Sequence, residues 1–267
     1  MPLAPRPTAC FAALLLSVIA SPAVAAVAVL SDDFNDNAIG SAWNLHVDNA
    51  ARLTLDESSE RLNVLASAPL NLQDDALYLS KFRLSTANDF EMRINYNFTG
   101  VQSAGAIGDY FGLTFGLGRD LDGFDSAAVG FGYVRTPLGV TTAASVAYRI
   151  NDEQTTEYAT NPLAETGGPA NATFVIAYDA ETDSLAFSRL VGVDLTTLAT
   201  VSDVVGKAWQ ADDLLVSFGA RGKGFSTSDG QAWFDDFSVV SGTLVPEPMS
   251  MGILIGAPLM LRRRRRS

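Results

Sequence analysis

The chain has 267 residues, of which 18% are charged, and a formal net charge of −12 at pH 7. This acidity argues against nucleic acid or an anionic membrane as a partner, because both are negatively charged themselves. The single cysteine, Cys10, lies close to the start of the chain. The rest of the chain therefore cannot form a disulfide framework, a thiolate metal site or a cysteine nucleophile.

Residues 1–26 have the pattern of a secretory signal peptide. Arg6 gives the first residues a positive charge, residues 9–20 are apolar, and small residues follow them. This order is typical of an export signal that signal peptidase removes. We predict cleavage after Ala25 or Ala26, with Ala23 as part of the small-residue motif. Cys10 would leave with the peptide.

Residues 27–243 are predicted to form one all-β domain. In residues 90–98 large apolar side chains alternate with polar ones, which indicates a strand with one buried and one exposed face. No stretch with a helical period is long enough to compete. The number of strands favours a two-sheet antiparallel jelly roll over a seven-stranded immunoglobulin sandwich. Further strands are predicted at 53–56, 61–66, 77–84, 111–117, 128–134, 145–150, 174–179, 184–190, 214–220 and 231–240.

The two ends of this domain resemble the terminal strands of concanavalin A-like lectin and glucanase domains. The segments are Asp32-Asp33-Phe34 and Phe234-Asp235-Asp236-Phe237-Ser238-Val239, and residues 174–179 with 184–187 look like the central hairpin of that fold. The resemblance implies that the first and last strands lie side by side. It also implies carbohydrate binding or cleavage on the concave face, although a fold does not fix a function.

Glycines alternate with large residues in two segments, at positions 112, 116 and 118 and at positions 130 and 132. A hairpin of these segments would have a smooth face that a ligand could approach, or a strongly curved sheet in which glycine relieves crowding. Hydrogen-bonding candidates for a glycan lie nearby in sequence, namely Glu91, Arg93, Asn95 and Asn97. The aromatic residue that would stack on a sugar could be Trp43, Tyr110, Trp209 or Trp233.

Catalytic motifs are absent from the sequence. A glucanase of this fold needs two glutamates and an aspartate on one strand face, but Glu181-Thr182-Asp183 lacks the second glutamate and sits in a predicted turn. His46 is the only histidine, which removes most histidine-based acid–base and metal sites. We therefore predict a protein that is not an enzyme.

Calcium is the one cofactor that the sequence suggests, at two places. Asp120, Asp122 and Asp125 surround Gly123 as in a truncated calcium loop, and a simple Asp-Gly turn explains them equally well. Asp33 and Asp235, with their neighbours, would face one another if the terminal strands pair. Either a cation would compensate these carboxylates, or each pair would cap a turn and face water.

Residues 244–267 form a tail that resembles the PEP-CTERM sorting signal of exported bacterial proteins. Its elements are Pro246, Glu247 and Pro248, then the uncharged run Met249–Leu261, and finally Arg262, Arg263, Arg264, Arg265 and Arg266. The resemblance implies processing by exosortase, a membrane-embedded cysteine transpeptidase, in a Gram-negative bacterium. The apolar run has 13 residues, about 20 Å as a helix against roughly 30 Å of hydrocarbon, so we read it as a transient anchor.

Removal of both ends lowers Lys plus Arg from 18 to 12 and Asp plus Glu from 30 to 29, which leaves a net charge of about −17. The sequence thus predicts an exported, non-catalytic jelly-roll protein of the cell surface, the outer membrane or the extracellular matrix. Its predicted partners are signal peptidase, exosortase and an exopolysaccharide, without nucleic acid. A polysaccharide hydrolase or lyase and a purely structural biofilm matrix component are the alternatives.

Overall fold

The computed structural model describes residues 29–67, 72–102, 105–119, 126–151, 156–166, 168–202, 209 and 213–246, with the side chains of 149–151 and 156–166 outside the description. Within these ranges the chain forms strands and no helix. The strands are β1 (Leu30–Asp32), β2 (Trp43–Val47), β3 (Leu53–Glu57), β4 (Leu62–Ala66), β5 (Asp74–Ser85), β6 (Phe90–Phe98), β7 (Tyr110–Gly118), β8 (Ser126–Thr136), β9 (Gly139–Asn151), β10 (Thr156–Thr166), β11 (Asn171–Asp179), β12 (Ser184–Val191), β13 (Asp194–Ser202), β14 (Asp213–Gly222), β15 (Ala232–Ser241) and β16 (Leu244–Pro246).

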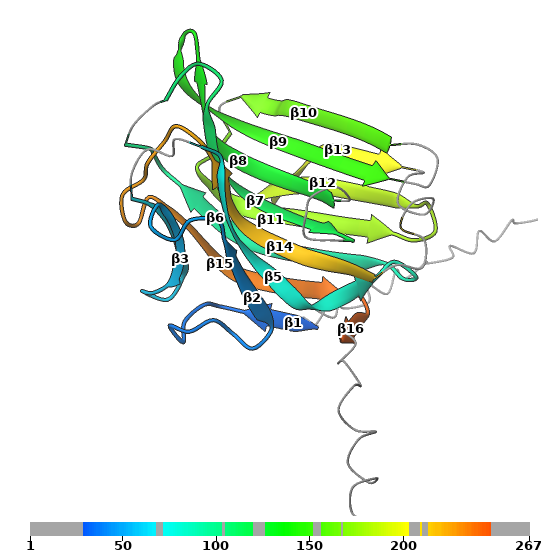
Figure 1. Ribbon diagram of the computed structural model, residues 1–267. Coiled ribbons are helices and arrows are strands. Elements are labelled where there is room, and N and C mark those ends of the chain that lie inside the picture. The colour runs from blue at the N-terminus through cyan, green and yellow to red at the C-terminus, as the bar shows by residue number, and fades with distance from the viewer. Residues whose placement is uncertain are drawn as a thin grey trace, which may run out of the picture.

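The strands form two antiparallel sheets that pack face to face (Figure 1). The first sheet has the order β13-β12-β11-β6-β15-β4-β3, and β1 pairs with β15. The second has the order β10-β9-β8-β7-β14-β5-β16, and β2 pairs with β5. The predicted two-sheet jelly roll is thereby confirmed.

An aromatic cluster fills the space between the sheets. The indole of Trp43 lies 4.8 Å from the ring of Phe218 and 4.9 Å from that of Phe237, centroid to centroid, in edge-to-face contacts. Phe34 and Tyr78 complete this cluster, and all five side chains are almost fully buried. Burial of such large apolar surfaces is the main force that holds two sheets together, and edge-to-face contacts add to it.

Alternation in the sequence corresponds closely to the observed strands. β6 spans the predicted residues 90–98, and its apolar side chains point into the core while its polar ones point outward. β1 pairs with β15, with Asp32 opposite Phe237, so the predicted contact of the first and last strands is confirmed. The predicted central hairpin is β11–β12, joined in register from Thr173–Leu190 to Asp179–Ser184.

Two long strands were not predicted, β10 and β13. β13 lies at the end of the first sheet, and most of its side chains are exposed, so it lacks the alternation of a half-buried strand. β10 lies at the end of the second sheet and contains Pro162, a residue that usually indicates an edge or a break.

The predictions for the two ends of the chain concern residues beyond the description. These are the signal peptide, with Ala23, Ala25 and Ala26, and the tail from Glu247 and Pro248 through the C-terminal sorting helix to Arg262, Arg263, Arg264, Arg265 and Arg266. Among the residues that the structure describes, none belongs to a helix of the length and apolarity needed to cross a membrane.

Candidate functional site

The outer face of the second sheet contains a strip of small residues, which we call the glycine floor. It consists of the outward-facing positions of β7 and β8, namely Gly112, Thr114, Gly116, Gly118, Ser126, Ala128, Gly130 and Gly132. Their outward direction follows from the alternate positions Phe111, Leu113, Phe115 and Leu117, which are buried in the core. Gly112 lies opposite Gly132, and Gly116 opposite Ala128.

Glycine is required where neighbouring strands come very close. A Cβ on Gly116 would lie 2.6 Å from the carbonyl oxygen of Ala127, and a Cβ on Gly132 would overlap the carbonyl oxygen of Phe111. A Cβ on Gly112, by contrast, would lie 3.3 Å from its nearest neighbour, the carbonyl oxygen of Phe131. Relief of crowding therefore explains Gly116 and Gly132, and the same absence of side chains leaves the sheet surface open.

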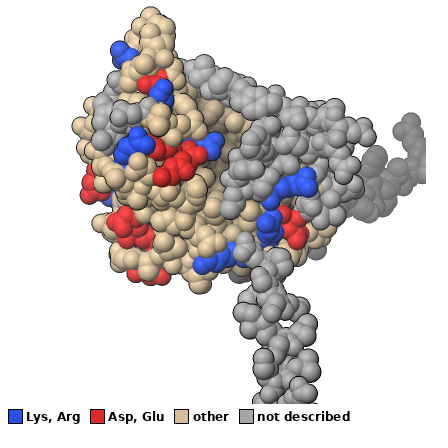
Figure 2. Space-filling view, viewed as in Figure 1, with Lys and Arg blue, Asp and Glu red and all other residues tan. Residues whose placement is uncertain are grey.

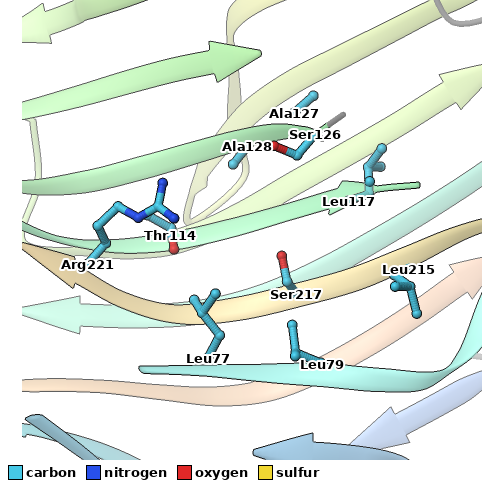
Figure 3. Close-up of a pocket in the computed structure, with 11 residues that line it drawn as sticks. Leu77, Leu79, Thr114, Leu117, Ser126, Ala127, Ala128, Leu215, Ser217 and Arg221 are labelled. Carbon is cyan, nitrogen blue, oxygen red and sulfur yellow. The ribbon is translucent and has the colours of Figure 1, made fainter. Parts of the chain in front are cut away.

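A pocket of about 100 Å³, which we call the hollow, opens over this floor (Figure 3). Thr114 of β7 and Ser217 of β14 present hydroxyl groups to it, and neither side chain makes a hydrogen bond to another described residue. Leu77 and Leu79 of β5 provide an aliphatic wall. The hollow thus offers hydroxyl groups, aliphatic carbon and exposed backbone.

Arg221 lies at one end of the hollow, beside Thr114 in Figure 3. Its Nε and Nη2 atoms donate hydrogen bonds of 2.9 Å and 2.6 Å to the carboxylate of Asp75 on β5. The hydrogen bonds to Asp75 raise the pKa of the Arg221 guanidinium further above its usual value, so the guanidinium stays charged. Arg221 is the only charged residue among the described residues that line the hollow, and Asp75 compensates it. Figure 2 shows this face, with a broad uncharged area between groups of charged side chains.

The four aromatic residues that were candidates for stacking on a sugar differ in burial and in the sheet face on which they lie. Trp43 and Trp209 are 1% and 0% exposed, so neither can stack on a ligand. Tyr110 is half-buried on the same face as the glycine floor, two residues before Gly112 and close enough to Arg221 to affect its pKa. Trp233 is half-buried on the outer face of the first sheet, with the guanidinium of Arg61 5.4 Å from its ring centroid.

The predicted glycan residues Glu91, Arg93, Asn95 and Asn97 lie on that outer face of the first sheet, and not beside the glycine floor. Each of these four side chains already makes a hydrogen bond within the protein. Arg93 Nε donates to Glu91 Oε1 at 2.6 Å, and Asn95 donates to Asp236 at 3.0 Å and accepts from Thr173 at 2.6 Å. Asn97 is nearly buried and donates to the carbonyl oxygen of Gln231.

The predicted acidic contact between Asp33 and Asp235 lies where β1 meets β15. Partial burial raises the pKa of Asp235 most, and the neighbouring Asp236 raises it further. Asp33 makes a smaller contribution in the same direction, so the carboxylates of Asp33 and Asp235 lie close enough to interact. Asp33 accepts from Asn35 at 2.6 Å, and Asp235 accepts from the amide of Asp236 at 2.8 Å. No three acidic, histidine or cysteine side chains of the described ranges are grouped so as to hold a metal ion.

The other proposed calcium ligands, Asp120, Asp122 and Asp125, lie outside the described residues. Calcium at either place therefore stays a prediction.

The turn predicted at Glu181-Thr182-Asp183 is confirmed, because Asp179 Oδ1 accepts hydrogen bonds from the amides of Glu181 and Thr182 at 2.9 Å and 3.0 Å. His46 is an exposed surface residue whose Nε2 contacts Asp48 Oδ1 at 3.1 Å.

A carboxyl group with a strongly shifted pKa lies elsewhere, between the sheets. Glu57 of β3 is 6% exposed, and burial raises the pKa of its carboxyl to about 7. A group of this kind can act as a general acid, but Glu57 is buried against Tyr78 between the sheets and does not line the hollow. The sequence did not single out Glu57, Asp75, Arg221, Thr114 or Ser217, because only the fold shows which of them are buried and which meet.

No family model and no curated protein matches the chain. Several solved structures resemble the chain, among them the following three. The metal-free lectin I-B4 from Griffonia simplicifolia is 12% identical over 79% of this chain and 98% of the lectin, with a TM-score of 0.49. The carbohydrate recognition domain of Emp47p is 12% identical over 80% and 95%, with a TM-score of 0.49. The Bacteroides ovatus protein xyloglucan PUL GH43B is 17% identical over 78% of this chain and 38% of its own, with a TM-score of 0.48.

Proposed function

We propose that this chain is an exported, non-catalytic surface protein that binds an uncharged polysaccharide in the hollow of its second sheet. The observation that supports the proposal is the set of described residues that line the hollow, which combines hydroxyl groups and aliphatic side chains with a single, already paired charge. Thr114 and Ser217 offer hydroxyl groups with no partner among the described residues, Leu77 and Leu79 offer aliphatic contact, and Arg221 is already neutralised. Sugars bind to such mixtures of aliphatic surface and hydrogen-bonding groups.

The charge of the domain favours a neutral ligand. The domain between the predicted signals has a net charge of about −17. A polyanion would be repelled by this charge, and the hollow has no free cation among its described residues to compensate. A neutral chain avoids this repulsion, and the glycine floor would let it approach the backbone closely.

We also propose that the tail is a PEP-CTERM sorting signal that exosortase processes. The support is the order of its elements, a Pro-Glu-Pro triplet, an apolar run and five arginines, together with the export signal at the other end. The tail would insert transiently into the membrane. The mature protein would then reside at the cell surface, at the outer membrane or in an exopolysaccharide matrix, as a protein of a biofilm.

Affinity electrophoresis of residues 27–246 tests the proposed binding. The gels contain the exopolysaccharide of the producing organism, a neutral glucan or a uronic-acid polymer, each with calcium and with chelator. We expect a neutral polymer to retard the protein, and Ser217→Leu, which fills the hollow, to abolish the retardation. Ser238→Leu is the matched control, since it makes the same change on the outer face of the first sheet.

The outcomes separate the alternatives. Unchanged mobility in every gel would leave a structural matrix component, which predicts self-association without sugar. New reducing or unsaturated ends after incubation with a polymer would instead indicate a hydrolase or lyase. Retardation that the chelator removes would add calcium to the site.

A further inference from the structure

The last strand, β16, ends at the residue where the proposed sorting motif begins. β16 adds to the edge of β5, with Leu244 opposite Leu84, Val245 opposite Arg83 and Pro246 opposite Phe82. Pro246 is the first proline of the Pro-Glu-Pro triplet. The edge strand and the motif therefore share this residue.

Contacts before β16 fix the strand on the domain. The amide of Ser85 donates to the carbonyl oxygen of Thr243 at 3.1 Å, and Asn88 donates to the hydroxyl of Thr243 at 3.3 Å. Gly242 has a φ of +130°, and a Cβ there would lie 2.7 Å from the Cβ of Phe90. Leu244 packs against the core. The chain thus reaches Pro246 through a tight bend followed by a paired strand.

Little chain separates this strand from the apolar run. Only Glu247 and Pro248 lie between Pro246 and Met249, the first residue of the uncharged run. Two extended residues span roughly 7 Å. A peptidase that holds its substrate in an extended cleft needs more chain than this, so a folded domain with β16 in place would obstruct it. Release of residues 242–246 would add five residues, roughly 17 Å of extended chain.

We propose that β16 is a latch that regulates processing of the tail, because a peptidase can act at the sorting motif only when β16 has left β5. This inference rests on the proposed sorting function. Figure 1 shows β16 at the end of the sandwich where β5 and β15 also end, remote from the β8–β9 hairpin. Release would leave the two sheets intact, since β5 keeps its pairing with β14 through Leu84 and Leu214.

A reversible cross-link tests the latch in the full chain. Val245 and Arg83 lie directly opposite each other, so the double variant Val245→Cys with Arg83→Cys can join β16 to β5 by a disulfide. After signal cleavage no native cysteine remains to compete. The single variants are the controls, which matters because Arg83 also donates to the carbonyl oxygen of Asp213 at 3.0 Å.

Pulse-chase labelling in the producing organism measures conversion of precursor to mature protein. We expect the oxidised double variant to be processed at least roughly tenfold more slowly than either single variant, and reductant to restore the rate. Leu244→Asn, which removes the apolar contact of β16, is expected to accelerate processing several-fold.

Two results would overturn the inference in distinguishable ways. If the cross-link forms, as mass spectrometry shows, and the tail is still removed at the wild-type rate, the latch is wrong and the sorting proposal stands. If the wild-type protein keeps its tail wherever it is found, the sorting proposal fails and the latch fails with it.

Discussion

The hydroxyl of Tyr78 on β5 donates a 2.9 Å hydrogen bond to Oε1 of Glu57 on β3, and so joins the two sheets through a buried carboxyl group. Oε2 of Glu57 is buried without a hydrogen-bond partner among the described residues. Desolvation by burial raises the pKa of Glu57 to about 7, the bond from Tyr78 opposes this rise, and the carboxylates of Asp32 and Asp36 add to it. The protonated form of Glu57 is therefore the one that fits this site at mildly acidic pH.

Glu57→Gln should remove a pH dependence of stability. Folding raises the pKa of Glu57 from 4.5 to about 7, so its contribution is complete below pH 4.5 and is lost as pH rises through 7. The loss amounts to about 3 kcal/mol at pH 8. The variant, which is uncharged at every pH, should be more stable than the wild type at pH 8 by about this amount. Urea unfolding at pH 5 and pH 8 measures it.

Glu60→Gln is the matched control, because Glu60 is exposed and close to Glu57 in sequence. It should keep the pH dependence of the wild type. A Glu57→Gln profile that parallels the wild-type profile between pH 5 and pH 8 would show that Glu57 titrates at an ordinary pKa.

Tyr78→Phe keeps the aromatic ring in the core and removes the hydrogen-bond donor that Glu57 has among the described residues. We expect a loss of about 1–2 kcal/mol, since a buried acceptor is left without its partner. The bond from Tyr78 lowers the pKa of Glu57, so its removal should also move the pH dependence to higher pH. Thermal unfolding followed from pH 5 to pH 9 checks both effects, and an unchanged midpoint at pH 8 would argue against the bond.

The strands that the sequence predicts best are those with one buried face. In β6 the alternation of apolar and polar residues reports directly which side chains face the core, and its bounds were predicted to the residue. β13 could not be found in this way, because Thr196, Thr197 and Thr200 are exposed on an end strand whose side chains do not divide into two faces. Local pattern thus predicts strands through burial, and fails where burial is absent.

The candidate site depends on pairing between distant segments, which one sequence does not specify. The resemblance of the terminal segments correctly brought β1 beside β15 and so placed Asp33 near Asp235. No such pattern in the sequence predicts that Arg221 forms hydrogen bonds with Asp75, 146 positions away. Nor does any pattern predict that Trp43 and Trp209 are buried. The glycines were recognised, but the predicted hydrogen-bonding residues lie on the other sheet.

Gly132→Ala and Gly112→Ala should differ sharply, although these glycines face each other across β7 and β8. A Cβ at Gly132 would overlap the carbonyl oxygen of Phe111, which belongs to the rigid backbone of the neighbouring strand. We expect Gly132→Ala to destabilise the fold by about 2–3 kcal/mol. For Gly112→Ala, whose Cβ would lie 3.3 Å from the oxygen of Phe131, we expect less than about 1 kcal/mol. Equal losses in urea unfolding would contradict the close approach at Gly132.

Tyr110→Ala should weaken glycan binding, and Trp233→Ala should not. Tyr110 is the candidate aromatic on the face of the hollow, whereas Trp233 lies on the opposite sheet. Loss of one aromatic contact with a sugar is expected to reduce affinity about tenfold, or about 1.4 kcal/mol. Both variants keep the buried aromatic core, and urea unfolding of each checks that folded proteins are compared in the glycan gels. The reverse result, a loss with Trp233→Ala alone, would move the binding site to the outer face of the first sheet. There Asn95, Asn97 and Arg93 would become its hydrogen-bonding residues.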